Sequence, residues 1–252
     1  MGSSDASAID YDLRAESETA WITIDRPEKR NALDLEGWRA LRGAVDRASE
    51  EARVAVLAGA GDAFCAGDDI ATVAGLESEA DVRALADCLH DGLYGVERAP
   101  VPVVAAVDGP AYGGGFELVA AADLAVATDR AAFALPETTI GAYPPYAADR
   151  IGAICGRKRL MELALTGDPV DAATAREWGL VNRVVDEGDL AGAVADLVDR
   201  ILDAPAPATR LAKAAVARSL ADGGERDRIA GGFARVATSE DCRDAARAFL
   251  DG

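Results

Sequence analysis

The stretch VVAAVDGPAYGGGFEL, residues 103–118, predicts a buried strand, a glycine-rich turn and the start of a helix. Its first five residues are apolar and have the length of a buried strand. The triplet Gly113-Gly114-Gly115 lets the backbone approach a ligand closely, because glycine has no Cβ and adopts unusual φ values at little cost. A helix from the triplet to about residue 122 would direct unpaired N–H groups toward an anion.

Two carboxylates accompany this unit: Glu117 in the first turn of the expected helix, and Glu137 in Pro136-Glu137, twenty residues later. Two carboxylates across a small cavity can move protons in opposite senses. Combined with an anion site, they indicate chemistry on a carbonyl compound that passes through an enolate. Each half of the pattern has another explanation. A turn or tight helix packing also uses a glycine triplet, and Glu117 could lie on a solvated helix face.

The segments around this unit predict further strands and helices in alternation. Residues 9–13 and 20–24 alternate as a β-hairpin that turns around residues 16–18. Asp34 is a suitable N-cap for an amphipathic helix to about Glu51. Residues 54–58 form a short apolar strand, 79–97 a helix and 124–127 another strand. This rhythm is typical of βαβ units, in which helices pack against a sheet.

From Asp149 onward the pattern becomes mostly helical. Apolar residues recur at helical spacing over 187–202, 208–220 and 225–250, and the segment 203–207, DAPAP, separates the first two. An apolar helical tail after an α/β core is a natural oligomerisation or capping element.

Composition excludes some classes of partner. The 252 residues carry 44 acidic and 26 basic side chains, a net charge of −18 that disfavours binding to nucleic acid and to anionic membranes. No apolar run has the length of a membrane span, and the first residues lack a secretory signal, so we expect a soluble cytoplasmic protein. The lysines are Lys29, Lys158 and Lys213 only, which resembles proteins of salt-loving organisms. An acidic, alanine-rich protein from a GC-rich genome would share this bias.

The cysteines and the single histidine do not predict a metal centre. Cys65, Cys88, Cys155 and Cys242 lie far apart without a CxxC pair, so neither a metal site nor a disulfide framework is expected. His90 could act as a catalytic base, but a lone histidine in a helix is more often a surface or packing residue.

Six blocks of sequence, in order, resemble the crotonase, or enoyl-CoA hydratase/isomerase, superfamily. They are 22–33 (ITIDRPEKRNAL), 64–70 (FCAGDDI), 103–111 (VVAAVDGPA), 111–118 (AYGGGFEL), 161–167 (MELALTG) and 175–185 (AREWGLVNRVV). The resemblance covers nearly the whole chain. It implies an α/β fold that is a crotonase-like spiral of ββα units. Residues 1–190 would form the core with the acyl-CoA site, and 191–252 a C-terminal helical region that forms a homotrimer or a dimer of trimers.

The resemblance also implies a reaction. The substrate would be an acyl-CoA thioester, with coenzyme A as part of the substrate and no other cofactor. The N–H groups of Asp68 and Gly114 would form the oxyanion hole. Having both Glu117 and Glu137 favours the two-glutamate hydratase type, which adds water in syn geometry across the C2–C3 double bond. Glu117 would activate water for C3 and Glu137 would handle the proton at C2. A double-bond isomerase, another enolate-forming acyl-CoA enzyme, and a catalytically idle or RNA-binding member of the fold are the alternatives.

Further substrate contacts follow from the same resemblance: Ala66, Gly67, Asp69 and Ile70 beside the oxyanion hole, Lys29 and Arg30 for the CoA phosphates, and Tyr143. Asp68 occupies a position often held by alanine, so its carboxylate must point away from the enolate. The segment Tyr143-Pro144-Pro145-Tyr146 replaces a glycine-rich loop of the hydratase type. It could reshape the acyl pocket, move the catalytic water, supply a phenolic acid, or only rebuild a loop. The final residues, Phe249 to Gly252, lack the basic groups with which relatives often hold the CoA phosphates.

Overall fold

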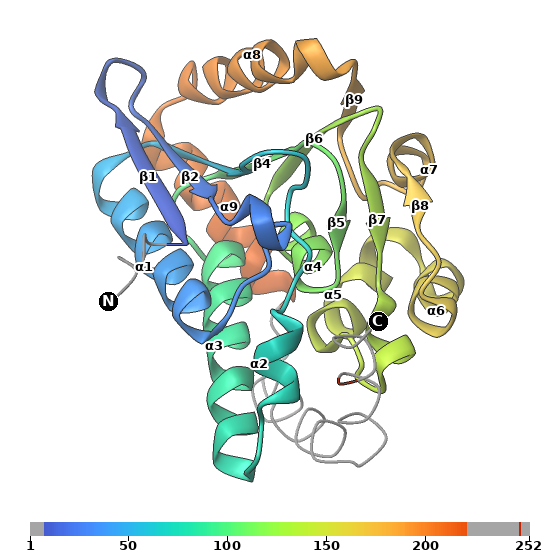
Figure 1. Cartoon of the computed structure of the whole chain (residues 1–252). Helices are drawn as coiled ribbons and strands as arrows, with labels where there is room; N and C mark the ends of the chain where they lie inside the picture. Colours follow the sequence, from blue (N-terminus) through green and yellow to red (C-terminus); the bar gives the residue numbers. More distant parts are fainter. Residues whose placement is uncertain (1–7, 221–246, 248–252) are drawn as a thin grey trace.

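The computed structural model describes residues 8–220 and residue 247, and it confirms the expected α/β class (Figure 1). The strands are β1 (Ile9–Arg14), β2 (Thr19–Ile24), β3 (Val54–Gly59), β4 (Val103–Val107), β5 (Ala111–Tyr112), β6 (Leu124–Thr128), β7 (Ala132–Ala134), β8 (Val170–Asp171) and β9 (Arg183–Val185). The helices are α1 (Leu35–Glu51), α2 (Ile70–Ala74), α3 (Glu79–Glu97), α4 (Gly114–Ala121), α5 (Pro145–Cys155), α6 (Arg157–Thr166), α7 (Ala172–Glu177), α8 (Leu190–Leu202) and α9 (Ala206–Leu220). Short 3-10 helices are η1 (Ala15–Ser17), η2 (Pro27–Lys29), η3 (Pro136–Ile140) and η4 (Glu187–Asp189).

The main sheet has the strand order β1-β2-β3-β4-β6-β9, and only the β1–β2 hairpin is antiparallel. Successive side chains of a strand point to opposite faces, so each inner strand supplies two cores. In β3, Ala55 and Leu57 join the large core beneath α1 and α3, while Val54 and Val56 pack with α8. Helices therefore cover both faces, with α8 on the side away from α1 and α3 (Figure 1).

Most of the expected elements are confirmed, together with their start signals. The hairpin turns at η1, and α3 spans the predicted residues 79–97. The Asp34 side chain accepts a hydrogen bond of 2.8 Å from the Gly37 N–H and caps α1 as expected. His90 is buried in α3, with its ring 4.7 Å from that of Tyr94, so it is a packing residue.

The region after residue 149 contains two strands that the helical pattern did not predict. β9 is three residues long and extends the main sheet beyond β6, and the two-residue β8 pairs with β7. Such short strands are stabilised by pairing and leave no periodic pattern of their own. α9 begins at Ala206, before the predicted residue 208, because Pro207 fits the first turn of a helix. The predicted helix 225–250 lies outside the described residues, except for residue 247.

Within residues 8–220, no helix combines the length and the apolar character needed to cross a membrane.

Candidate active site

The small sheet β5-β7-β8 explains the twenty-residue spacing of the two glutamates. β5 runs parallel to β7, with Tyr112 opposite Ala134, and the Gly113 N–H donates to the Ala134 carbonyl at 2.9 Å. The residues that follow the two strands therefore lie side by side. Glu117 follows β5 in α4, and Glu137 follows β7 in η3. This pairing brings together carboxyl groups that are distant in sequence.

Each glycine of the triplet has its own structural reason. Gly113 precedes α4 with φ 53° and ψ −127°, and a Cβ there would lie 3.2 Å from a Glu137 carboxyl oxygen. A Cβ on Gly115 would overlap the Cys65 carbonyl oxygen. Gly114 is the first residue of α4, where a main-chain N–H has no acceptor within the helix. Both explanations of the glycine triplet are therefore correct, at different residues: Gly114 begins the helix, and Gly115 permits tight packing.

The loop before α2 places the Asp68 main chain beside Gly114. Leu33 forms a parallel bridge with Asp68: its N–H donates to the Gly67 carbonyl, and its carbonyl accepts from the Asp69 N–H, each at 2.8 Å. In this pattern the Asp68 N–H points away from Leu33. This N–H has no hydrogen-bond acceptor in the described part of the chain. Gly67 has φ 87°, and a Cβ there would come within 2.8 Å of the Gly114 nitrogen. Two main-chain donors so arranged suit an oxygen that gains negative charge.

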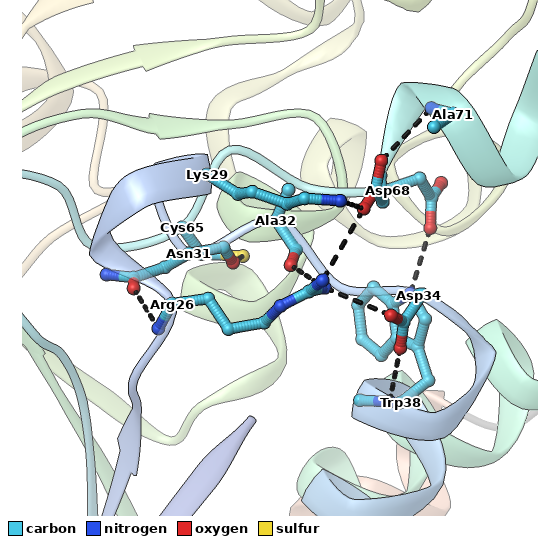
Figure 2. A network of polar contacts seen from close by, with 11 residues as sticks. Arg26, Lys29, Asn31, Ala32, Asp34, Trp38, Cys65, Asp68 and Ala71 are labelled. Atoms are coloured by element: carbon cyan, nitrogen blue, oxygen red, sulfur yellow. Dashed lines mark hydrogen bonds and ion pairs between the residues drawn. The ribbon is translucent and has the colours of Figure 1, made fainter. Parts of the chain in front are cut away.

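The Asp68 carboxyl group is held by Trp38 of α1. The Trp38 indole Nε1–H donates to Asp68 Oδ1 at 2.8 Å (Figure 2). Burial raises the pKa of Asp68 to about 6; the Trp38 hydrogen bond opposes this shift and the charge of Asp69 adds to it. The side chain is thus anchored on a helix, and its charge still acts on the neighbouring carboxyls.

Glu117 lies in the first turn of α4 and is 2 % exposed. Its Oε1 accepts a hydrogen bond of 2.7 Å from the Ala147 N–H at the start of α5. Burial raises the pKa of Glu117 to about 8, and the charge of Asp68 acts in the same direction. The N–H groups of Ala147 and Tyr146 lower it, because they favour the ionised form.

Glu137 lies in the first turn of η3 after Pro136, and it is half-buried. Burial and the charge of Glu117 raise the pKa of Glu137 well above its usual range. Its Oε2 is buried and has no hydrogen-bond partner among the described residues. An unpartnered buried oxygen is costly unless it is protonated or a ligand fills the space. Glu137 is therefore the more easily protonated member of the pair.

Asn31 fixes the loop that carries the oxyanion-hole residues. Its buried amide nitrogen donates to the carbonyls of Ala60 at 2.8 Å, Ala63 at 2.7 Å and Phe64 at 3.3 Å, and its Oδ1 accepts from the Arg26 N–H. Its backbone has φ 60°, a left-handed conformation that asparagine tolerates. The 26–31 turn and the 60–64 turn are thereby joined.

The two expected CoA contacts, Lys29 and Arg30, differ in their surroundings. Lys29 Nζ lies 2.6 Å from Asp69 Oδ2 and its side chain is 45 % exposed, and Arg26 Nη2 lies 3.7 Å from the same oxygen. Asp69 also caps α2 by accepting from the Ala71 N–H. The Arg30 side chain is exposed, and its carbonyl accepts from the Ala66 N–H. Asp69 thus has three partners within the chain, Lys29, Arg26 and the Ala71 N–H, whereas the Arg30 side chain is exposed on the turn.

The remaining predicted contact residues lie around the same loop and in the segment after η3. Ala66 and Gly67 precede Asp68, and Ile70 begins α2. Tyr143 is half-buried between η3 and α5.

Trp38 and Ala147 were not predicted as parts of the site. Trp38 lies in α1, the amphipathic helix that Asp34 caps, and its ring is fully buried. A buried indole needs an acceptor for its N–H, and this requirement was the available signal. For Ala147 the signal was Pro144-Pro145, since proline is favoured at the first helical position and the next N–H groups have no acceptor within the helix.

Comparisons with known proteins agree with this geometry. Residues 14–250 match the family model described as enoyl-CoA hydratase/isomerase. A probable enoyl-CoA hydratase of Rhizobium meliloti (strain 1021) is 37 % identical over 211 residues, which are 82 % of this chain and 81 % of the relative. A carnitinyl-CoA dehydratase of Proteus mirabilis (strain HI4320) is 34 % identical, with 91 % of each protein covered.

Solved structures are similar over almost the whole length. An enoyl-CoA hydratase/isomerase from Xanthobacter autotrophicus Py2 is 30 % identical with a TM-score of 0.87, covering 97 % of this chain and 96 % of the other. An enoyl-CoA hydratase from Mycobacterium smegmatis is 32 % identical with a TM-score of 0.81, covering 98 % and 97 %.

Proposed function

Because this chain belongs to the enoyl-CoA hydratase/isomerase family, we propose that it adds water reversibly to the C2–C3 double bond of a 2-enoyl-CoA thioester. The crotonase-type fold expected from the sequence is confirmed by the solved structures that it matches. The observation that carries the proposal is the pair of carboxyls, Glu117 and Glu137, beside the N–H groups of Asp68 and Gly114. The first carboxyl has main-chain donors, and the second has a buried oxygen without one.

The two N–H groups would bind the thioester oxygen. That oxygen gains negative charge when water attacks C3 and an enolate forms. Fixed donors stabilise this charge without reorganising, and each contributes about 3–4 kcal/mol to the transition state. Asp68 supplies its donor from the main chain, and the hydrogen bond to Trp38 anchors its carboxyl elsewhere.

The environments of the two glutamates support a division of roles. The Ala147 N–H favours ionised Glu117, so this carboxylate would take a proton from water as the oxygen attacks C3. Burial and the charge of Glu117 raise the pKa of Glu137 well above its usual range, so Glu137 would be protonated and would deliver its proton to C2. One water is consumed, and proton exchange between the glutamates restores the starting state. Because the two carboxyls are coupled, their apparent pKa values belong to the pair.

The second candidate is a double-bond isomerase on the same scaffold. The segment from Tyr143 to Tyr146 favours it, because Pro144 and Pro145 offer no N–H groups to a water molecule. An isomerase would use one glutamate to move a proton along the acyl chain and would retain no water oxygen in its product.

For the rest of the molecule, we propose a homotrimer or a dimer of trimers in the cytoplasm, with no cofactor besides the CoA of the substrate. Exposed apolar side chains on α5, α6 and α9 support assembly; they are Ile154, Met161, Leu165, Leu211 and Val216. Sedimentation of a stable monomer would contradict this arrangement. Lys29, Arg30 and Tyr143 remain the proposed contacts for CoA and the acyl chain, with Arg30 the more available cation. Ala66, Gly67, Asp69 and Ile70 would line the thioester end.

The test is to mix the protein with crotonyl-CoA and with longer, branched and aromatic 2-enoyl-CoAs. Hydration removes the conjugated double bond, so the absorbance of the conjugated thioester should fall. Water labelled with oxygen-18 should enter the product at C3, which separates a hydratase from an isomerase. An unchanged absorbance with every substrate would refute the hydratase.

Glu117→Gln and Glu137→Gln should each reduce kcat by about two to four orders of magnitude, because a general acid or base contributes about that factor. Both variants should still bind an acyl-CoA. A rate near that of the wild type for either would remove that residue from the mechanism.

A further inference from the structure

Helix α5 begins at the Glu117 carboxyl group. Pro144 and Pro145 have no N–H, so Tyr146 and Ala147 supply the first donors of this eleven-residue helix. The Ala147 N–H lies 2.7 Å from Glu117 Oε1. The amino end of a helix also carries partial positive charge, which stabilises a carboxylate there. The position of the first turn of α5 thus sets how strongly Glu117 is held.

A buried network ties that first turn to the end of α3. The Tyr146 hydroxyl donates to Glu97 Oε2 at 2.8 Å. Arg150, one turn further along α5, donates from Nε to Oε2 at 2.8 Å and from Nη2 to Oε1 at 3.3 Å. These three side chains are between 1 % and 7 % exposed. Glu97 therefore receives three donors from two positions that lie on either side of Ala147.

Stability alone does not explain this arrangement. A buried ion pair contributes little net stability, because both ions lose their hydration. Glu97 is the last residue of α3, where the helix dipole disfavours a negative charge. Glu97 interacts with the positive charges of Arg150 from α5 and Lys213 from α9. Glu117 interacts with the negative charges of Asp68 and Glu137. What the network supplies is a fixed position for α5 relative to α3 and α4.

We propose that Glu97, Tyr146 and Arg150 are positioning residues that hold the Ala147 N–H against Glu117 and thereby keep this carboxyl ready to accept a proton. The inference rests on the proposed function for its kinetic consequence, and on geometry alone for its effect on Glu117. It gives the Tyr143-Pro144-Pro145-Tyr146 segment a definite role: the prolines start the helix, and Tyr146 anchors it.

Tyr146→Phe tests the network with the smallest change, since it removes one hydroxyl and leaves the ring. The Ala147 N–H would move away from Glu117, so the carboxyl should bind its proton more tightly. The rising limb of kcat against pH should shift upward by about 0.5 to 1 unit, and kcat near pH 7 should fall about three- to tenfold. KM should change less than about twofold. Glu97→Gln should shift the limb in the same direction.

Tyr94→Phe is the matched control. The Tyr94 ring packs against that of Tyr146 at 5.0 Å, and its hydroxyl bonds to Asp149 instead of Glu97. A general loosening of the α3–α5 contact would affect both variants alike, so equal shifts in the two would overturn the proposal. Ala147→Pro removes the N–H itself from the first turn of α5 and should give the largest shift. If that variant does not fold, Tyr146→Phe still decides.

Infrared difference spectra recorded against pH provide a readout that needs no activity. The band of protonated Glu117 can be identified by its loss in Glu117→Gln. Its midpoint should move upward in Tyr146→Phe and stay in place in Tyr94→Phe. An unmoved midpoint in Tyr146→Phe would refute the positioning role of the network, even if the wild-type protein were inactive on every enoyl-CoA. An inactive wild type with a moved midpoint would refute only the proposed hydratase activity.

Discussion

Asp68 contributes to the site in two opposing ways. Its main-chain N–H suits a developing oxyanion, while its carboxyl adds negative charge that raises the pKa values of Glu117 and Glu137. The sequence predicted the first contribution, together with the requirement that the carboxyl point away. It could not predict the Trp38 anchor, because that contact joins helix α1 to the loop before α2, and only the folded chain brings these two segments together.

Replacing Asp68 by asparagine should stabilise the protein above neutral pH. The folded-state pKa of about 6 lies above the ordinary value of 3.8, so the folded protein holds this proton more tightly than the unfolded chain. That stabilisation is complete below about pH 4 and is lost as the pH rises through about 6. Asp68→Asn should therefore raise the free energy of unfolding by about 1–2 kcal/mol at about pH 8, and by little at about pH 4. Urea unfolding at both pH values measures this, and an equal effect at both would contradict the assigned burial.

The ionisation of Glu117 should control the rate. If this carboxylate is the general base, kcat should fall about tenfold per pH unit below about pH 8, the pKa that burial gives Glu117. Asp68→Asn should move this limb downward, because it removes one of the charges that raise the pKa. Initial rates from about pH 6 to pH 9 test both statements. A rate independent of pH over this range would show that Glu117 is not the base.

Elements that begin or end at local sequence signals were predicted, whereas short strands that form only by pairing with a neighbour were not. The N-cap of α1 and the turn at η1 arise from neighbouring residues, and the sequence predicted both. β8 and β9 exist because β7 and β6 pair with them, and two or three residues cannot show a period. In the site, the glycine turn and both glutamates were found from the motif. The contact of Ala147 with Glu117 depends on how α5 packs on α4, which the sequence does not display.

Two glycine-to-alanine substitutions should separate the steric cost of a new Cβ from the gain in helix propensity. Gly115→Ala places a Cβ on the Cys65 carbonyl and should cost about 3 kcal/mol of unfolding free energy. Gly43→Ala adds a Cβ in α1 where nothing lies within 4 Å, and it should add up to about 1 kcal/mol, because alanine is the better helix former. Thermal or urea unfolding compares them. A mild Gly115→Ala would mean that α4 can shift away from its neighbour.

For the whole molecule, the net charge of −18 should make stability depend on salt. Like charges repel across a compact surface, and dissolved ions screen that repulsion within about 10 Å at 0.1 M. The melting temperature should rise by at least about 5 °C between ~0.1 M and ~2 M KCl, in accord with the expected salt-loving origin. Matched melts in sucrose, which adds no ions, serve as the control. An unchanged melting temperature would favour the explanation from genome composition.

The contact between Trp38 and Asp68 makes the protein its own optical probe. Trp38 is fully buried, whereas Trp21 and Trp178 are half-buried. The emission of an indole responds to charge beside its N–H, and here that charge belongs to the residue whose main chain would hold the thioester oxygen. Fluorescence from this one ring should therefore report both the protonation of Asp68 and the arrival of an acyl-CoA. Binding could then be followed in real time without a label, even in variants that no longer turn over.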